Sequence, residues 1–577
     1  MTEDARAGVK PKVQVEGSPL AADVETLLEL VVVDDHLHLP DMFLLSFRDA
    51  AHAVARQAQL QIGARVKISV PSPAGGGTET LIEGEVTAME AEYDAAGSRA
   101  VVRGYDGSHR LHRGRVTQTY QNVKDSDIAR TVSQRAGLQT GTIDDSQTTH
   151  EHVSQVNVSD WDFLKARAAE IGFELAVSEG KLNFRKPSQS KGAPGSGDFN
   201  SNDPLQLVFG GDLLEFRPRV SSSEQVKDVK VRGWDPKAKQ AVIGQAQAGT
   251  TSVQLPATPG DLAQKFGGPT YVAVDHPLST QREVDATARA MAEQIGSAVA
   301  EAEGVARGNP KLRAGAAVSV AAVGEDFVGR YTLTHTRHVF DAHGYRTRFE
   351  VSGRQDRSLL GLVANGALPS SAAGPPIYGV VIGQVTNNED KDQPGSGRVK
   401  LKFPWLSDTY ESDWARLMQT GAGPDSGVSF MPEVNDEVLV AFEFGDVRRP
   451  VVIGGLHNGK DKPRLGDGLF DNGKVKRRGI VSRKGHRLVF LDGSDKSGIA
   501  LISSNGNIRI SLNETKKEIH VFCDGKVRIE AKDELSIKSD KKLSLEGNQL
   551  ELNGKSGAKV GGGSGSVEVS GTSIKLG

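Results

Sequence analysis

Short segments of alternating apolar and polar residues repeat toward the end of this chain. Pairs of aliphatic residues begin at Val527, Leu535, Leu543 and Leu550, so one repeat takes about eight residues. A single ribbon of such strands leaves its apolar face in water and its edges unpaired, whereas three copies around one axis bury that face. We therefore predict a trimeric, intertwined β-helical needle over residues 480–577. Its strands are expected at 526–530, 534–538, 542–546 and 549–553.

The apolar positions of these repeats define the predicted trimer core. Each aliphatic side chain contributes about 1.5–3 kcal/mol when it is fully buried, and only the association of three chains provides that burial. The outward positions Arg528, Glu530 and Lys538 mix both charges, which suits a solvated shaft. A narrow, densely hydrogen-bonded shaft indicates a mechanical function. The residues predicted to face the trimer axis are Val527, Ile529, Leu535, Ile537, Leu543, Leu545, Leu550, Leu552, Val567 and Val569.

Length and composition limit the remaining possibilities. A chain of 577 residues exceeds what one hydrophobic core usually supports, so three or four domains are expected. Its 66 glycines and 5% aromatic residues are typical of a turn-rich, mainly β protein. The net charge of −3 argues against a nucleic-acid coat and against a binder of anionic membranes. Cys523 is the only cysteine, which excludes an intrachain disulfide and a cysteine metal site.

No membrane or export signal is recognisable in the sequence. The first residues lack an apolar signal core, and the longest apolar run, at 27–33, is too short to span a bilayer. We expect synthesis in the cytoplasm, and for any export a route that reads no signal peptide.

Three stretches with the composition of loops divide the chain, at 186–204, 365–376 and 459–478. Strands dominate before the first stretch, and two helices are predicted there, at 125–136 and 159–171.

The part between the first and second stretches loosely repeats the part before them. Its strands surround one Ala-rich helix, predicted over 280–303. We therefore predict two related β-domains, with an α/β insertion that ends in a hairpin around Glu179-Gly180.

A small barrel is predicted between the second and third stretches. Five short strands with Gly-rich turns within about eighty residues are typical of an OB barrel. The strands are expected at 378–386, 398–403, 413–418, 437–444 and 450–454. The Arg448-Arg449 pair is interpreted as a turn before Pro450.

This barrel resembles the OB domain of VgrG-type spike proteins. The matching runs are YGVVIGQVTN at 378–387, GRVKLKFPW at 397–405, WAR at 414–416, FMPEVNDEVLV at 430–440 and GDVRRPVVIG at 445–454. Upstream, VSDWDFL at 158–164 and EIG at 170–172 are similar to the matching stretch of the phage hub family.

The resemblance implies a homotrimer within a contractile injection system. In this family two tube-like β-domains per chain give the trimer a pseudo-sixfold ring that meets the hexameric inner tube. The OB domain forms the neck, and the needle points at the target membrane. Baseplate proteins and cargo effectors are further expected partners. A PAAR-type protein commonly caps the tip, so its docking is expected on Ser573, Ile574, Lys575, Leu576 and Gly577.

The prediction is therefore a mainly β, multidomain protein with seven parts. They are a first tube-like β-domain at 1–119, an α/β insertion at 120–190, a second tube-like β-domain with a helix at 191–364, a linker at 365–376, an OB-fold neck at 377–458, a connector at 459–479 and a β-helical spike at 480–577.

No catalytic, cofactor or metal site is predicted. About twenty residues separate the barrel from the needle, too few for the lysozyme domain that some phage spikes carry there. The GKS run at 554–556 lacks the glycine and the strand–loop–helix context of a phosphate loop. The DDHLH run at 34–38 and the HEH run at 150–152 offer metal-type ligands on alternate positions, but no third ligand stands at motif spacing. We favour polar strand ends for both.

The lead hypothesis is a non-enzymatic, homotrimeric hub-and-spike protein that adapts the inner tube to a needle and punctures the target envelope. A phage-tail-like extracellular particle is slightly favoured over a type VI secretion VgrG that delivers effectors. One rival is an OB-fold oligonucleotide-binding protein, and another is a polysaccharide-acting β-helix protein, which needs larger coils and a carboxylate cluster. The first rival would use Phe403, Trp405, Trp414, Lys400 and Lys402, for which we favour packing in the neck without nucleic acid.

Overall fold

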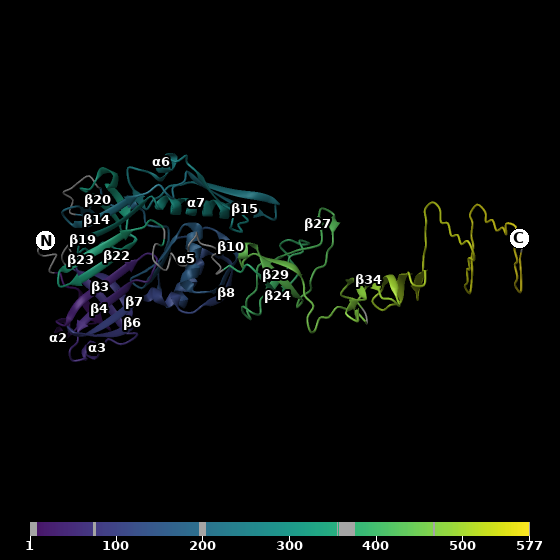
Figure 1. Ribbon diagram of the computed structural model, residues 1–577, viewed down its shortest axis with the longest axis horizontal. Coiled ribbons are helices and arrows are strands. Elements are labelled where there is room, and N and C mark those ends of the chain that lie inside the picture. The colour runs from purple at the N-terminus through teal and green to yellow at the C-terminus, as the bar shows by residue number, and fades with distance from the viewer. Residues whose placement is uncertain are drawn as a thin grey trace. The chain divides into compact units, whose positions relative to one another are not determined.

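The chain folds into two units, Met1–Asn458 and Gly459–Gly577. The computed structural model in Figure 1 describes residues 9–72, 77–195, 203–354, 356, 376–465 and 468–575. The predicted mainly β, multidomain fold is confirmed, because strands far outnumber helices in the described ranges. None of the helices in these ranges is long and apolar enough to cross a membrane.

One antiparallel sheet of eleven strands runs through the amino-terminal unit. It joins strands of the two predicted β-domains at a seam, where β22 pairs with β3 and Val339 lies opposite Val32. Figure 1 shows β22 and β3 side by side. The shared hydrogen bonds make the two halves one continuous sheet. In sheet order the strands are β14 (Leu213–Val220), β19 (Ala300–Arg307), β23 (Gly344–Val351), β22 (His335–Asp341), β3 (Leu28–His36), β4 (Met42–Arg48), β7 (Gly97–Asp106), β6 (Thr78–Asp94), β5 (Arg65–Pro71), β1 (Lys12–Val15) and β2 (Ser18–Pro19).

A separate hydrophobic core serves each half of this sheet. Phe43 and Ile68 are fully buried in the first core, and Phe340 of β22 joins them across the seam. Tyr331 and Phe349 are buried in the second core, under a small four-stranded sheet. The strands of that sheet are β13 (Gln206–Val208), β20 (Ala317–Ala321), β21 (Gly329–Thr332) and β17 (Val253–Gln254). Short helices complete the two halves: α2 (Ala22–Glu25), α3 (Val54–Gln57), α6 (Pro259–Gln264), η2 (Ser190–Gly192) and η3 (Glu325–Phe327).

The α/β insertion contains both predicted helices. Ser159 caps the second of them by accepting a hydrogen bond from the N–H of Asp162 at 3.1 Å, and Gly172 ends it with φ of 70°. Trp161 and Leu164 then pack into one core with Ile128. The elements are η1 (Gly107–His112), β8 (Val116–Lys124), α4 (Asp125–Arg135), β9 (Gln139–Ile143), β10 (Thr149–Val158), α5 (Asp160–Ile171), β11 (Glu174–Ser178) and β12 (Lys181–Arg185).

The helix predicted over 280–303 is shorter than expected, and the prediction was wrong beyond residue 297. Helix α7 (Gln281–Ser297) covers a three-stranded sheet of β15 (Asp228–Asp235), β16 (Gln240–Gln247) and β18 (Thr270–Ala273). The next residues form β19, because Ala300, Ala302 and Ala306 are buried while the glutamates between them are not. This alternation has a period of two, the period of a strand.

The barrel has the five strands expected of an OB fold. Phe403 lies fully buried at its centre, with its ring 5.6 Å from that of Phe442, and Val385 and Val440 pack around it. The sheet order is β25 (Lys400–Lys402), β24 (Val380–Asn387), β29 (Glu437–Phe442), β30 (Pro450–Gly455) and β26 (Arg416–Leu417). The added elements are the hairpin β27 (Ala422–Gly423) and β28 (Ser426–Gly427) and the turn η4 (Glu443–Gly445).

The carboxy-terminal unit begins with a hairpin and continues as an antiparallel meander of five strands. No strand is assigned among the described residues after Cys523, so the four strands expected between 526 and 553 do not form within one chain. A strand exists through hydrogen bonds to a neighbour, and the single chain provides none there. The elements are β31 (Phe470–Asp471), β32 (Lys474–Val475), β33 (Arg477–Val481), β34 (Arg487–Asp492), β35 (Ser497–Ile502), β36 (Ile508–Asn513) and β37 (Glu518–Cys523).

The DDHLH run lies at the seam of the large sheet. Asp34 is 3.3 Å from Nε2 of His335, and Asp35 pairs with Arg313. The ring of His36 lies 5.1 Å from that of His335. These side chains therefore make contacts between the two halves, and no group of three metal-type ligands is found among the described residues.

Two further carboxyls are buried beside Asp35. Burial raises the pKa of Asp106 to about 7, and that of Asp41 well above its usual range. One carboxyl oxygen of Asp106 accepts a hydrogen bond from the N–H of Ser108 at 3.3 Å, while Oδ2 is buried without a partner. An oxygen in such surroundings favours the protonated, neutral acid.

We predict that Asp106→Asn flattens the pH dependence of stability. A carboxyl whose folded pKa is raised stabilises the fold below its unfolded value of 3.8, and this contribution is lost as the pH rises through about 7. Between pH 5 and pH 8 the free energy of unfolding should fall by an amount on the order of 3 kcal/mol through this carboxyl alone. Melting temperatures between pH 5 and pH 8 should therefore fall more steeply for the wild type than for the variant. The exposed Glu92→Gln serves as the control, and equal slopes for all three proteins would contradict the prediction.

Candidate assembly surfaces

The meander of the carboxy-terminal unit has one strongly apolar face. Strand pairing sets its side chains in two rows, one through Phe490, Ile499 and Leu512 and one through Leu501 and Ile510. Nine of its ten large apolar side chains are 38–73% exposed to solvent. The apolar sheet face consists of Ile480, Leu488, Phe490, Ile499, Leu501, Ile508, Ile510, Leu512, Ile519 and Val521.

The opposite face of the same meander is different in kind. It mixes Ser511, Asn513 and Glu518 with the partly exposed Phe522, and its two central apolar side chains, Val489 and Ala500, are already buried. A soluble protein rarely leaves a contiguous apolar patch of this size uncovered unless it is a contact surface. The apolar sheet face is therefore a candidate interface, which the sequence analysis did not name.

The predicted trimer-core residues follow the meander, and the single chain does not bring them together. All ten are described, and each is 54–68% exposed. Of the predicted tip residues, Ser573, Ile574 and Lys575 are exposed, while Leu576 and Gly577 lie outside the described residues. The alternation at Ile508, Ile510 and Leu512 is the same signal that located the later repeats, so the sequence could have extended the surface to the meander.

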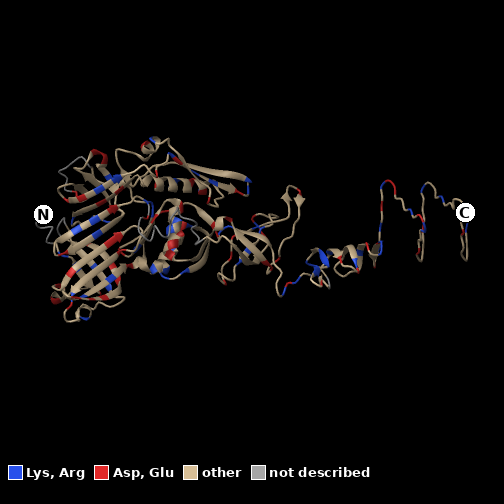
Figure 2. Cartoon of the chain, in the orientation of Figure 1, with Lys and Arg blue, Asp and Glu red and all other residues tan. Residues whose placement is uncertain are grey.

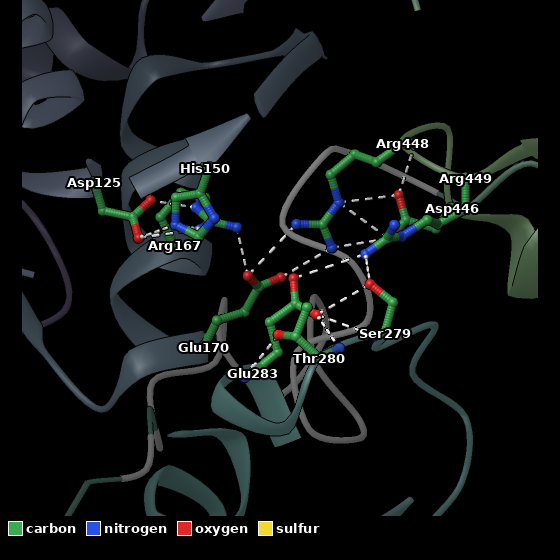
Figure 3. A network of polar contacts seen from close by, with 10 residues as sticks. All are labelled: Asp125, His150, Arg167, Glu170, Ser279, Thr280, Glu283, Asp446, Arg448 and Arg449. Carbon is green, nitrogen blue, oxygen red and sulfur yellow. Dashed lines mark hydrogen bonds and ion pairs between the residues drawn. The ribbon is translucent and has the colours of Figure 1, made fainter. Parts of the chain in front are cut away.

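A second feature, in the amino-terminal unit, is a buried polar network between the OB barrel and the α/β insertion. Figure 3 shows Arg448, from the turn between β29 and β30, between Glu170 of α5 and its neighbour Asp446. Its Nη2 atom donates to Glu170 Oε1 at 3.0 Å and to Asp446 Oδ2 at 2.8 Å. The Arg448-Arg449 pair does lie in a turn, as interpreted from the sequence, but it also makes contacts with residues that are far away in the chain.

The network continues in two directions from Arg448. Glu170 contacts Arg167, whose Nε donates to Asp125 Oδ1 at 2.6 Å. Asp125 also lies 3.0 Å from Nε2 of His150, the first histidine of the HEH run. On the other side, Arg449 donates to Ser279 Oγ at 3.1 Å, next to the start of α7 (Figure 3). The barrel is thus tied to three separate helices.

The arginines of the network stabilise the ionised form of its carboxyl groups in spite of their burial. Burial alone would raise the pKa of Glu170, but Arg167 and Arg448 outweigh it and hold this pKa below its usual value. The pKa of Asp446 is likewise lowered, by Arg448, in spite of its burial. These carboxylates therefore stay ionised at neutral pH, where each has an arginine partner.

Strand β10 adds direct packing to this joint. Val156 belongs to the hydrophobic core of the OB barrel. Oγ of Ser154 lies 3.1 Å from the hydroxyl of Tyr410, and Nε2 of His152 donates to the carbonyl of Glu411 at 3.0 Å. Both histidines of the HEH run therefore serve the joint, and the barrel shares a core and a network with the insertion.

Two family models match this chain. One is described as the Alg8 N-terminal domain and matches residues 8–341, more than half of the chain. The other is described as the type VI secretion system/phage-baseplate injector OB domain and matches residues 381–457.

Two proteins with similar sequences are spike proteins of type VI secretion systems. The type VI secretion system spike protein VgrG2a of Pseudomonas aeruginosa is 31% identical over 123 residues, which are 20% of this chain and 14% of VgrG2a. The spike protein VgrG3 of Vibrio cholerae is 40% identical over 62 residues, 10% of this chain and 6% of VgrG3. The matched regions are thus short parts of these relatives.

A solved structure, the Francisella PdpA-VgrG complex in its lidded form, has a similar fold. It is 11% identical, with a TM-score of 0.51, and the match covers 89% of this chain and 79% of that chain. At this identity the likeness concerns the fold alone.

We predict that Arg448→Met loosens the joint between the barrel and the insertion. The substitution leaves Asp446 buried without its arginine and Glu170 with Arg167 alone, which costs about 3 kcal/mol. Hydrogen exchange of the amides in β29 and β30 should accelerate, and the melting temperature should fall.

Arg416→Met is the matched control, because its pair with Glu443 lies on the surface of the same barrel. It should cost less than about 1 kcal/mol. If both variants exchange and melt alike, Arg448 does not hold the joint.

Proposed function

The chain belongs to the Alg8 N-terminal domain family and is a VgrG-type spike protein, a structural component of contractile injection systems, and we propose that three copies of it assemble into a hub with a needle. The domain arrangement proposed is the one predicted from the sequence. Residues 1–364 form the hub with its insertion, 377–458 the neck and 480–577 the needle.

The single observation that supports a trimer is the unburied apolar surface of the carboxy-terminal unit. The apolar sheet face is continued in the chain by ten further exposed aliphatic residues. Burying the remaining exposed area of the sheet face alone is worth on the order of 10 kcal/mol per chain. Association costs about 4–15 kcal/mol, so this burial is of the size that a stable assembly needs.

Three copies suit the repeats better than two. Each repeat is a narrow ribbon with one apolar side and a charged outer side, and three such ribbons enclose a closed axis in which no strand edge stays open. A closed, hydrogen-bonded shaft of this kind resists bending and transmits axial force. The proposed task is therefore mechanical, to puncture a target envelope, and it gives the chain no catalytic role.

The joint between barrel and insertion supports the same task. Force that enters the hub reaches the neck through the shared core and the arginine network. The hub would dock on the hexameric inner tube and on baseplate proteins, and the tip would hold a PAAR-type protein or a cargo effector. In the solved Francisella complex the VgrG protein is bound to PdpA. The proposal favours a phage-tail-like particle, with a type VI secretion spike as the alternative.

We predict that the full-length protein is a trimer and that Ile510→Asp abolishes this state. The side chain of Ile510 lies within the apolar sheet face, where a carboxylate would meet apolar walls or its own copies and remain unpaired. Mass photometry should give three times 61.5 kDa for the wild type and smaller species for the variant.

Ser511→Asp is the matched control, since Ser511 is the next residue and points to the opposite face. This variant should keep the trimer mass. A monomeric wild type, or a trimer that Ile510→Asp leaves intact, would refute the proposal.

A second substitution tests the inward assignment of the later repeats. Ile537→Asp should weaken the needle, because three carboxylates would meet near the axis, whereas Lys538→Glu, at an outward position, should not. Limited proteolysis of both variants checks this through the rate of cleavage after residue 524. Equal cleavage would show that Ile537 does not face the axis.

A further inference from the structure

Positive charge is concentrated in one short stretch of the carboxy-terminal unit. Residues 459–487 carry ten Lys and Arg against three Asp, a net charge of +7, whereas the other 548 residues carry −10. The 90 residues that follow have thirteen basic and twelve acidic side chains and are nearly neutral. The net charge of −3 for the whole chain conceals this separation. The basic collar consists of Lys460, Lys462, Arg464, Lys474, Lys476, Arg477, Arg478, Arg483, Lys484 and Arg487.

The structure presents much of this collar to solvent. Lys and Arg gather around β34 in Figure 2, and Lys462, Arg464, Lys474 and Lys484 are all exposed. Acidic contacts of the described residues temper the charge: Lys476 pairs with Asp471 at 2.9 Å and lies 3.9 Å from Asp495, and Arg478 pairs with Asp492. More basic than acidic groups remain, so the surface keeps a positive potential.

A small hairpin in the collar adds an apolar group to the charge. Strands β31 and β32 are joined by Asn472-Gly473, with φ of 47° and 78°, which is the turn chemistry of a tight hairpin. Phe470 stands on this hairpin and is 61% exposed, near the exposed Lys474. An exposed aromatic ring beside lysines is the combination found where proteins meet the headgroup layer of a membrane.

We propose that the basic collar binds the phosphate headgroups of an anionic lipid bilayer. Polybasic clusters of four to eight residues attract such headgroups, and the collar has ten in each chain. Nucleic acid is a poorer fit, because strand-binding proteins stack successive bases on several aromatics and Phe470 is the only aromatic residue between 459 and 487. If the proposed function holds, three collars encircle the base of the needle, and they grip the bilayer once the nearly neutral needle has passed through it.

The test uses the full chain and vesicles of phosphatidylcholine with about 30% phosphatidylglycerol, compared with pure phosphatidylcholine. Flotation is measured at about 0.1 M and about 1 M salt, because screening weakens exposed charges at the higher concentration. The collar variant combines Lys462→Gln, Arg464→Gln, Lys474→Gln and Lys484→Gln. The matched control removes four exposed lysines beyond the collar, Lys516→Gln, Lys517→Gln, Lys541→Gln and Lys542→Gln.

We expect the wild type to bind the anionic vesicles in a salt-sensitive manner. The collar variant should bind them at least tenfold more weakly, and the control should stay within twofold of the wild type. Equal binding to neutral vesicles, or a collar variant that binds like the wild type, would overturn the proposal. It would also be overturned if the collar variant lost affinity for a DNA duplex or an acidic peptide but kept its affinity for vesicles.

Mass photometry of the same samples separates this proposal from the proposed function. A trimer that fails to bind vesicles refutes the collar alone. A monomer that binds them through the collar refutes the trimeric needle alone.

Discussion

The exposed apolar face of one sheet, and the hydrophobic effect that favours its burial, is the main physical constraint on this protein. Five strands form a meander whose apolar side stays exposed among the described residues of the carboxy-terminal unit, and on the proposed function other copies of the chain bury it. The rest of the carboxy-terminal unit has the same deficit, because its aliphatic repeats have neither a core nor a neighbouring strand. On the proposed function the chain is one subunit of an assembly, and the stability of its carboxy-terminal unit depends on that assembly.

The amino-terminal unit, in contrast, buries its apolar residues within the single chain. Its large sheet crosses from one β-domain to the other without interruption, and each half of it has its own core. The OB barrel shares a core residue, Val156, with the insertion, and the network around Arg448 ties it to the same part. The amino-terminal unit therefore forms its hydrophobic cores from one chain, which suits its proposed place as the hub to which the needle is attached.

In the sequence the basic collar lies between the packed amino-terminal unit and the exposed aliphatic repeats. Its charge would not help folding, since exposed like charges repel one another. It is confined to residues 460–487, which run from the end of the barrel into the first two strands of the meander, β33 and β34. The chain thus orders three chemical properties along its length: first the packed amino-terminal unit, then a cationic stretch, and finally apolar repeats whose outward residues carry both charges.

The sequence by itself determined the local elements and their faces. Ser159 and Gly172 delimit a helix through capping, Glu179-Gly180 closes a hairpin, and alternation along residues 527–569 shows which side of a strand is apolar. The error at the end of α7 has a related cause: alanine favours the helix by intrinsic propensity, and the pairing of β19 with two distant strands overrode that preference.

Only the tertiary structure decided which distant residues meet. Glu170 and Arg448 are separated by 278 positions and Asp34 and His335 by 301, and no local pattern marks either pair. Such contacts depend on how whole elements pack, because a buried charge is tolerated only where another element provides its counter-charge. The sequence could therefore show that an apolar ribbon needs partners, while the fold had to show where the neck is fixed to the hub.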